Sequence, residues 1–309
     1  MSLYQKLKRL YTHAQVLGTY WPDYRDAWIV PVRTDGRPDR VLDAGCGQGE
    51  ILAEFRRFDV PVDYHGVDLG VGERDWKFQV SAIADLHRLP YKNGSFDKII
   101  CNQVLEHVDR PDDVLGELVR VLSPGGRLFL SVPFVWHLHQ EPYDRFRFSL
   151  HALQYLLGKH ALTVDLIQPM GGYFSVLRYV LSSHTLVTAN LSRPWNVLAG
   201  FFSRLYKYFD VVIVAPTCFC LDHLDRGKKL TLGYFVHLSS VGPINSEIPD
   251  DPHCCPRCFI DEPNKLVQGP DNWTCSRCRT IFPVLEGVPI LTLPEAYPHV
   301  SDSLRSVRV

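Results

Sequence analysis

The sequence predicts a doubly wound α/β fold with a mostly parallel, seven-stranded sheet, a helical insertion and a small C-terminal domain. Three observations favour it. Short apolar runs alternate with amphipathic stretches, the first apolar run ends in a glycine-rich turn, and cysteines crowd one segment near the C-terminus. Strands separated by helix-length stretches imply right-handed crossovers, and therefore a parallel sheet.

The expected elements follow from hydrophobic periodicity and from the turn residues that bound each run. The expected strands are 41–44, 64–67, 79–84, 96–102, 127–132, 162–168 and 232–239. The expected helices are 49–58, 110–122 and 149–157, and a tight turn is expected at 123–126. Together these elements make up a sheet domain over residues 39–245.

Residues 1–38 are expected to form an N-terminal helical cap. Its aromatic side chains, which include Tyr11, Tyr20 and Trp21, could cover a bound ligand or simply pack in the core. A separate domain is expected over residues 253–296, after a linker rich in Pro and Asp.

The segment of about 173–226 is predicted to be an apolar helical insertion, because it is too long for a plain connection between two strands. It could complete the core, act as a lid over a hydrophobic acceptor, or form an oligomer contact. A shallow, peripheral contact with a membrane is a further alternative, because basic residues lie among its aromatic side chains.

Composition and charge limit the functions to consider. The formal charge is −1, with 46% hydrophobic and 22% charged residues, which is ordinary for a globular protein. No global basic field draws the chain to nucleic acid or to an anionic bilayer. The start has no apolar core of signal-peptide length. Charges interrupt the apolar stretch 197–221, so no transmembrane segment is expected.

The sharpest feature is the run VLDAGCGQGE, in which Asp43 precedes Gly45, Gly47 and Gly49. Glycine permits positive φ and a close approach of ligand to backbone, and the helix that follows offers unpaired N–H groups. A carboxylate beside the turn would repel a pyrophosphate, but it suits a ligand that carries an ammonium group.

This Asp-x-Gly-x-Gly-x-Gly turn resembles the cofactor loop of class I S-adenosylmethionine-dependent methyltransferases, in particular the type 11-like group. The segments HGVDLG, SAIADLHRLPY, SFDKIICNQVLEHV and LSPGGRLFLSVP are similar to later parts of that Rossmann-like fold, over about residues 38–172. The resemblance implies that Asp68 binds the ribose hydroxyls and that Asp85 faces the adenine amino group. The implied S-adenosyl-L-methionine site comprises Asp43, Ala44, Gly45, Cys46, Gly47, Gly49, Asp68, Leu69, Asp85, Leu86, Asn102 and Gln103.

The acceptor is expected at the carboxyl ends of the strands, beside segments 102–107 and 133–149. The candidate catalytic residues are His137, His139 and Asp144. Either histidine could take a proton at neutral pH, and the aspartate could orient it. Alternatively, Asp144 and Arg147 form a structural pair, either histidine caps a helix or faces solvent, and His107 only braces the site.

The nine cysteines are unevenly distributed, and five of them fall within 254–278. Without a secretory signal, such a cluster indicates metal ligands in a reducing compartment, so a cytoplasmic location is expected. The knuckles CPRC and CSRC supply Cys255, Cys258, Cys275 and Cys278 as a tetrahedral set for a structural Zn²⁺ ion. Cys254 is a spare thiol.

These knuckles and the following FPVLEGVPIL run resemble the zinc-knuckle activator subunit of tRNA and rRNA methyltransferases. The resemblance implies that the zinc domain docks on its own methyltransferase core and stabilises it; alternatively, it contacts a macromolecular substrate.

Three functions remain open. The leading one is methyl transfer to an oxygen of a small or lipid-like biosynthetic acceptor. The second is an RNA methyltransferase, which the near-neutral charge disfavours. The third is a non-catalytic module that binds S-adenosylmethionine.

Overall fold

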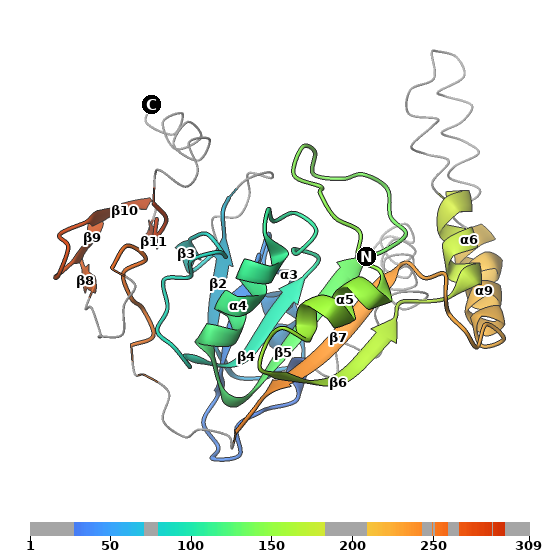
Figure 1. Ribbon diagram of the computed structural model, residues 1–309, viewed down its shortest axis with the longest axis horizontal. Helices are drawn as coiled ribbons and strands as arrows, with labels where there is room; N and C mark the ends of the chain where they lie inside the picture. Colours follow the sequence, from blue (N-terminus) through green and yellow to red (C-terminus); the bar gives the residue numbers. More distant parts are fainter. Residues whose placement is uncertain are drawn as a thin grey trace, which may run out of the picture. The chain divides into compact units, whose positions relative to one another are not determined.

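The computed structural model describes residues 28–70, 80–182, 209–242, 249, 251–258, 266–285 and 287–293 (Figure 1). The chain divides into two compact units, each described below by itself. The main unit comprises Trp28–Val132, Leu138–Leu166 and Val236–Val309. The second unit comprises Met1–Ala27, Pro133–His137 and Ile167–Phe235. Tyr11, Tyr20 and Trp21 of the predicted cap lie outside the described residues, as does the middle of the predicted insertion.

A seven-stranded sheet in the order β3-β2-β1-β4-β5-β7-β6 confirms the predicted fold class (Figure 1). Its strands are β1 (Asp39–Ala44), β2 (Val62–Asp68), β3 (Ala82–Ile83), β4 (Phe96–Asn102), β5 (Leu122–Pro133), β6 (Leu162–Pro169) and β7 (Gly233–Ser240). The neighbours from β3 to β5 all pair in parallel. The strand order reverses between β1 and β4, which is where open α/β sheets place their ligands.

Three helices of the main unit follow strands as the sequence predicts: α3 (Glu50–Arg57), α4 (Pro111–Val121) and α5 (Leu150–Leu157). Helix α3 buries Ile51 and Phe55, four residues apart and therefore on one face. Helix α4 starts with proline, whose fixed φ and missing N–H suit the first helical position. The Ser149 side chain caps α5 by accepting the Ala152 N–H at 3.2 Å.

Two expected elements differ from the structure. Strand β3 covers Ala82–Ile83 only, so it is shorter than the predicted 79–84. The turn expected at 123–126 is instead an irregular stretch within β5. There Phe96 pairs with Leu122, and Lys98 pairs with Arg127, so extra residues bulge out of one strand. Strand β5 therefore continues, with a bulge, through a sequence that is typical of a tight turn.

Two paired helices form the described ends of the apolar insertion in the second unit, α6 (Tyr173–Ser182) and α9 (Ala215–Asp222), which follows the π-helix η2 (Asp210–Val214). The Asp222 carboxylate accepts the backbone N–H groups of Gly172 at 3.0 Å and Phe174 at 2.9 Å, so it caps the start of α6. Arg178 and Asp210 form a buried ion pair at 2.7 Å. Among the described residues, no helix combines the length and the apolar character that crossing a membrane requires.

A second sheet of four strands, in the order β11-β10-β9-β8, follows in the main unit. Its strands are β8 (Leu266–Gln268), β9 (Asn272–Cys275), β10 (Ile281–Leu285) and β11 (Val288–Pro289). The end of this small sheet meets β3. Ile290 forms a parallel bridge with Ile83, and the Leu291 N–H donates to the Ile83 carbonyl at 2.8 Å.

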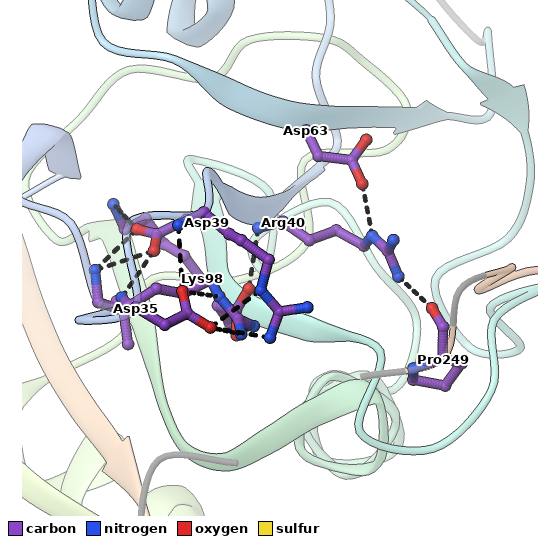
Figure 2. Close-up of polar contacts among 10 residues, drawn as sticks. Asp35, Asp39, Arg40, Asp63, Lys98 and Pro249 are labelled. Carbon is purple, nitrogen blue, oxygen red and sulfur yellow. Dashed lines mark hydrogen bonds and ion pairs between the residues drawn. The ribbon is translucent and has the colours of Figure 1, made fainter. Parts of the chain in front are cut away.

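Charged side chains, some buried and some exposed, lie together at the amino ends of β1 and β4, and we call this group the charged edge network (Figure 2). It consists of Arg33, Asp35, Asp39, Arg40, Asp63, Asp97 and Lys98. The Lys98 ammonium lies 3.1 Å from Asp39 and donates to the Trp28 carbonyl at 2.6 Å. Arg40 bonds Asp63 at 2.6 Å and the Pro249 carbonyl at 2.5 Å (Figure 2). The network therefore holds the segment before β1 against the sheet.

Candidate cofactor and metal sites

The glycine-rich turn begins where β1 ends and leads into α3. Gly45, Gly47 and Gly49 have φ values of 80°, 48° and 74°, a region that side chains with a Cβ rarely enter. A Cβ on Gly45 would lie 2.5 Å from a methyl carbon of Val104, whereas a Cβ on Gly47 would meet nothing within 4 Å. The turn is thus packed tightly at its first glycine and open at its second.

Asp68 closes the turn from the end of β2. Its carboxylate accepts the Gly47 N–H at 3.0 Å and the Gly70 N–H at 2.8 Å. Parallel pairing of β1 with β2 places it there, and the Gly45 N–H also bonds the Val67 carbonyl, at 2.8 Å. A carboxylate has about four lone-pair positions, so two hydroxyl groups can still bind this one.

Asp43 is buried beneath the turn and accepts a hydrogen bond from the Tyr64 hydroxyl at 2.6 Å. Burial raises the pKa of Asp43 to about 7, and the nearby carboxylates of Asp68 and Glu50 act in the same direction. A cationic ligand at the turn would favour the ionised form of this carboxyl group.

Asp85 and the buried Leu86 follow β3, as the register of the resemblance requires. One carboxylate oxygen of Asp85 accepts the His87 N–H at 2.9 Å and lies 2.8 Å from the His87 ring nitrogen Nδ1. The Ala84 N–H donates to the Asp68 carbonyl at 3.1 Å, which ties this loop to the end of β2. The contact of Asp85 with an adenine remains a prediction.

Strand β4 ends at Asn102, and Gln103 follows it. Ser131 of β5 forms hydrogen bonds with the side chains of both residues. The Gln103 side-chain amide donates to the Ser131 hydroxyl at 3.1 Å, and that hydroxyl bonds the Asn102 side chain. Gln103 has a φ of 55°, an unusual value for a residue with a side chain. Such a conformation indicates a backbone held by its surroundings.

Cys46 shows a role that the sequence did not reveal. Its side chain lies in an apolar cluster with Val80 and Ile83, at and just before β3, and with Val288 and Ile290, at and just after β11. The small domain therefore packs directly against the cofactor turn. Only the backbone of Cys46 remains for a ligand, because the thiol is buried in this cluster.

Two of the three predicted catalytic residues come together in the main unit. His139 Nδ1 lies 3.2 Å from an Asp144 oxygen that also accepts the His139 N–H at 2.9 Å. Arg147 binds both oxygens of Asp144, at 2.6 and 2.7 Å, and holds the pKa of Asp144 below its usual range. Asp144 is therefore a weak base that orients His139. The alternative predicted from the sequence, an ion pair between Asp144 and Arg147, is present as well.

His137 belongs to the second unit, where its backbone N–H and its Nδ1 both contact the Tyr179 hydroxyl. Trp136 stacks on Tyr179, with ring centroids 4.6 Å apart. Of the predicted trio, His139 and Asp144 are therefore the pair that the main unit brings together.

Glu106 is a polar residue that the sequence analysis passed over. Its side chain is fully buried, and among the described residues neither carboxylate oxygen has a hydrogen-bond partner. Burial raises the pKa of Glu106 to about 8 and lowers the pKa of the neighbouring His107. The signal in the sequence was a glutamate directly after the buried Leu105, inside an otherwise apolar run.

The four predicted zinc ligands are brought together. Cys255 and Cys278 have sulfurs 3.8 Å apart, as have Cys258 and Cys275, and all four sulfurs lie within 4.8 Å of one another. A tetrahedral ion with bonds of about 2.3 Å separates its sulfur ligands by roughly 3.8 Å. The donor set therefore fits Zn²⁺. Cys254 is not in this group; its N–H bonds the Pro90 carbonyl at 2.8 Å.

The turn, its carboxylates and the reversal of strand order define a Rossmann-like domain of the kind that holds a nucleoside cofactor at the carboxyl ends of its strands. Residues 24–165 match the family model of a methyltransferase domain. This match agrees with the resemblance to class I S-adenosylmethionine-dependent methyltransferases found in the sequence.

Curated relatives match about a third of the chain. Ubiquinone biosynthesis O-methyltransferase from Xanthomonas oryzae pv. oryzae is 33% identical over 115 residues, which cover 33% of this chain and 46% of that protein. Malonyl-[acyl-carrier protein] O-methyltransferase from Hahella chejuensis is 29% identical over 110 residues, 33% of this chain and 39% of that protein. The chain thus spans less than half of these relatives.

Proposed function

We propose that this chain transfers the methyl group of S-adenosyl-L-methionine to an oxygen of a small or lipid-like acceptor. The observation that carries the proposal is the Asp68 carboxylate, held by the N–H groups of Gly47 and Gly70 beside an open glycine turn. The names of both reported relatives describe methyl transfer to oxygen, which supports this acceptor atom.

The residues present fit the cofactor in three places. Asp68 offers oxygen acceptors for two ribose hydroxyls, and Asp43 offers a carboxylate for an ammonium group. Gly47 leaves room for a close approach to its backbone. The bound cofactor would supply a methyl carbon attached to a positively charged sulfur, already a good electrophile.

The chain's own contribution is to align the acceptor oxygen and to receive its proton. His139 is oriented by Asp144, whose carboxylate lies 3.2 Å from Nδ1, and its imidazole is the candidate proton acceptor. His137 stays a second candidate base. The acceptor oxygen gains the methyl group, the carbon–sulfur bond breaks with its electron pair on sulfur, and the acceptor proton passes to the base or to water.

We further propose that Cys255, Cys258, Cys275 and Cys278 bind a structural Zn²⁺ ion, and that the small domain stabilises the core in cis. The cluster of Cys46, Ile83 and Ile290 supports this docking, because it joins the two sheets beside the cofactor turn. Four thiolates need reducing conditions, and we place the protein in the cytoplasm on that ground.

A binding experiment and a transfer experiment test the function together. Calorimetry with S-adenosylhomocysteine should give one site, and Asp68→Asn should weaken it at least tenfold. Asp113→Asn is the matched control, since that side chain is exposed and only pairs with Arg110. Labelled methyl groups should then appear on hydroxylated or carboxylated apolar acceptors.

Two outcomes would replace the proposal. Transfer to RNA alone, with steep salt dependence, would make the chain an RNA methyltransferase. Tight cofactor binding without transfer to any acceptor would make it a non-catalytic module. A role of the apolar insertion in oligomers or at a membrane surface remains a prediction.

A further inference from the structure

Three potential metal ligands converge beyond the end of β4, apart from the four cysteines. Glu106, His107 and His139 each offer one ligand atom, and these atoms all lie within 4.8 Å of one another. Two of them follow β4, and the third follows β5, so the fold brings two segments together. We propose that Glu106, His107 and His139 bind a divalent transition-metal ion that keeps open positions for an oxygen ligand.

The strongest reason is Glu106. Its carboxylate is fully buried, and neither oxygen has a hydrogen-bond partner among the described residues. The nearest cationic candidate is His107, whose Nε2 lies 3.8 Å from Glu106 Oε1 and thus beyond hydrogen-bond distance. Arg147 is engaged by Asp144. Buried carboxylates are expected to be hydrogen-bonded, paired or bound to a metal, and this one has no hydrogen bond among the described residues.

The ring geometry suits coordination better than stacking. The centroids of His107 and His139 lie 4.8 Å apart, with an angle of 74° between the ring planes. Edge-to-face rings can point one nitrogen each toward a shared point. A tetrahedral ion with bonds of about 2.1 Å separates its ligand atoms by roughly 3.4 Å, so the present spacing needs only small side-chain rotations.

Asp144 supplies the outer support that metal-binding histidines usually have. Its oxygen lies 3.2 Å from His139 Nδ1, and Arg147 holds it in place through two bonds. A carboxylate beside Nδ1 favours the tautomer that coordinates a metal through Nε2. Asp144 is therefore a positioning residue.

The two segments that carry the ligands are also joined through their backbones. The Glu106 carbonyl accepts the N–H groups of Arg145 at 2.9 Å and Phe146 at 3.1 Å. The Arg145 side chain donates to the His107 carbonyl at 2.7 Å. The cluster is thus held before any ion arrives, which lowers the entropic cost of binding one.

The ligand set selects the kind of ion. Two imidazoles and one carboxylate suit Zn²⁺, Fe²⁺, Co²⁺ or Ni²⁺, and three protein ligands leave positions open. The four-cysteine site, in contrast, is closed. The His139 side chain is 23% exposed, so the cluster can be approached from its side. That this donor is the methyl acceptor rests on the proposed function, whereas the metal site itself does not.

The visible absorption of bound Co²⁺ distinguishes this site from the four-cysteine site. The full chain is first loaded with one equivalent of Zn²⁺, and Co²⁺ is then added without any S-adenosyl compound. We expect a second equivalent to bind with weak visible bands and without the intense thiolate-to-cobalt band. Glu106→Gln should weaken this binding at least a hundredfold, and Asp144→Asn about tenfold. Glu141→Gln is the matched control, because Glu141 is exposed and lies between His139 and Asp144 in the sequence. This variant should bind Co²⁺ as the parent does.

Glu106→Gln should fold, because it replaces a buried carboxyl group without a hydrogen bond by a neutral group of similar size. If it does not fold, His139→Ala is titrated with Co²⁺ in its place. Co²⁺ uptake that is absent, or equal in the parent and both variants, would overturn the metal site. S-adenosylhomocysteine binding, measured separately, would still report on the proposed function.

Discussion

Both ends of the large sheet bury ionisable side chains, but the two ends surround them differently. At the amino ends of β1 and β4, the buried Lys98 finds Asp39 and two backbone carbonyls, and Asp97 finds Arg33 and the Arg40 N–H (Figure 2). Beyond the carboxyl end of β4, the buried carboxylate of Glu106 finds no partner. Satisfied buried charges hold a structure together, and an unsatisfied one needs an explanation such as an ion or a catalytic role. The comparison locates function at the carboxyl end.

Removing a partner from the charged edge network should have the largest effect. Lys98→Ala removes the cation beside the buried Asp39 carboxylate, which then keeps only hydrogen bonds from the Val32 and Arg33 N–H groups; the change should cost about 3 kcal/mol of unfolding free energy. Urea unfolding measures it. Lys159→Ala, which removes an exposed pair with Asp112, should hardly change stability. Equal losses in both variants would mean that burial does not separate the two pairs.

The apolar contact at the carboxyl end should come next. Ile290→Ala removes a buried side chain from the cluster around Cys46 and should cost about 2–5 kcal/mol. Because the cluster supports the cofactor turn, affinity for S-adenosylhomocysteine should fall as well. Ile281→Ala is the control, since that side chain is 63% exposed. Unfolding calorimetry would contradict the docking if the small domain melted alone and the core melted unchanged.

The cofactor turn offers a matched pair of glycines. Gly45→Ala forces a Cβ against Val104 at a positive φ, and it should cost about 1–3 kcal/mol and abolish cofactor binding. Gly47→Ala is also strained by its φ of 48°, but its Cβ enters open space, so the loss of stability should be smaller than in Gly45→Ala. Thermal melts with and without S-adenosylhomocysteine compare the two. A turn that tolerates both substitutions equally would not be packed as described.

The smallest expected effect is on pH dependence. The pKa of Asp43 is about 7 in the cofactor-free protein, and a bound ammonium group favours the ionised carboxylate. Affinity should therefore rise as pH increases toward 7, by at most about tenfold per pH unit, and then level off. Asp43→Asn should flatten this profile.

Tyr64→Phe is the control for that profile, because it removes the hydrogen bond that lowers the pKa of Asp43. The midpoint should shift upward while the slope remains. A profile that Asp43→Asn leaves intact would assign the titration to another group.

Much of the fold and part of the site could be predicted, because their signals are local. Gly45, Gly47 and Gly49 adopt the expected positive φ, and the knuckle spacing brings the four sulfurs together. The burial of Glu106 could not be predicted, because it depends on how the segment after β5 packs on the segment after β4. The contact of Cys46 with Ile290 joins positions far apart in sequence, and no local pattern encodes it.

The most direct test of the account is calorimetric titration of the purified, zinc-loaded chain with S-adenosylhomocysteine and, separately, with a nicotinamide dinucleotide. The account predicts one site for the first compound, lost in Gly45→Ala, and no uptake of the second. Binding of the dinucleotide alone would contradict it.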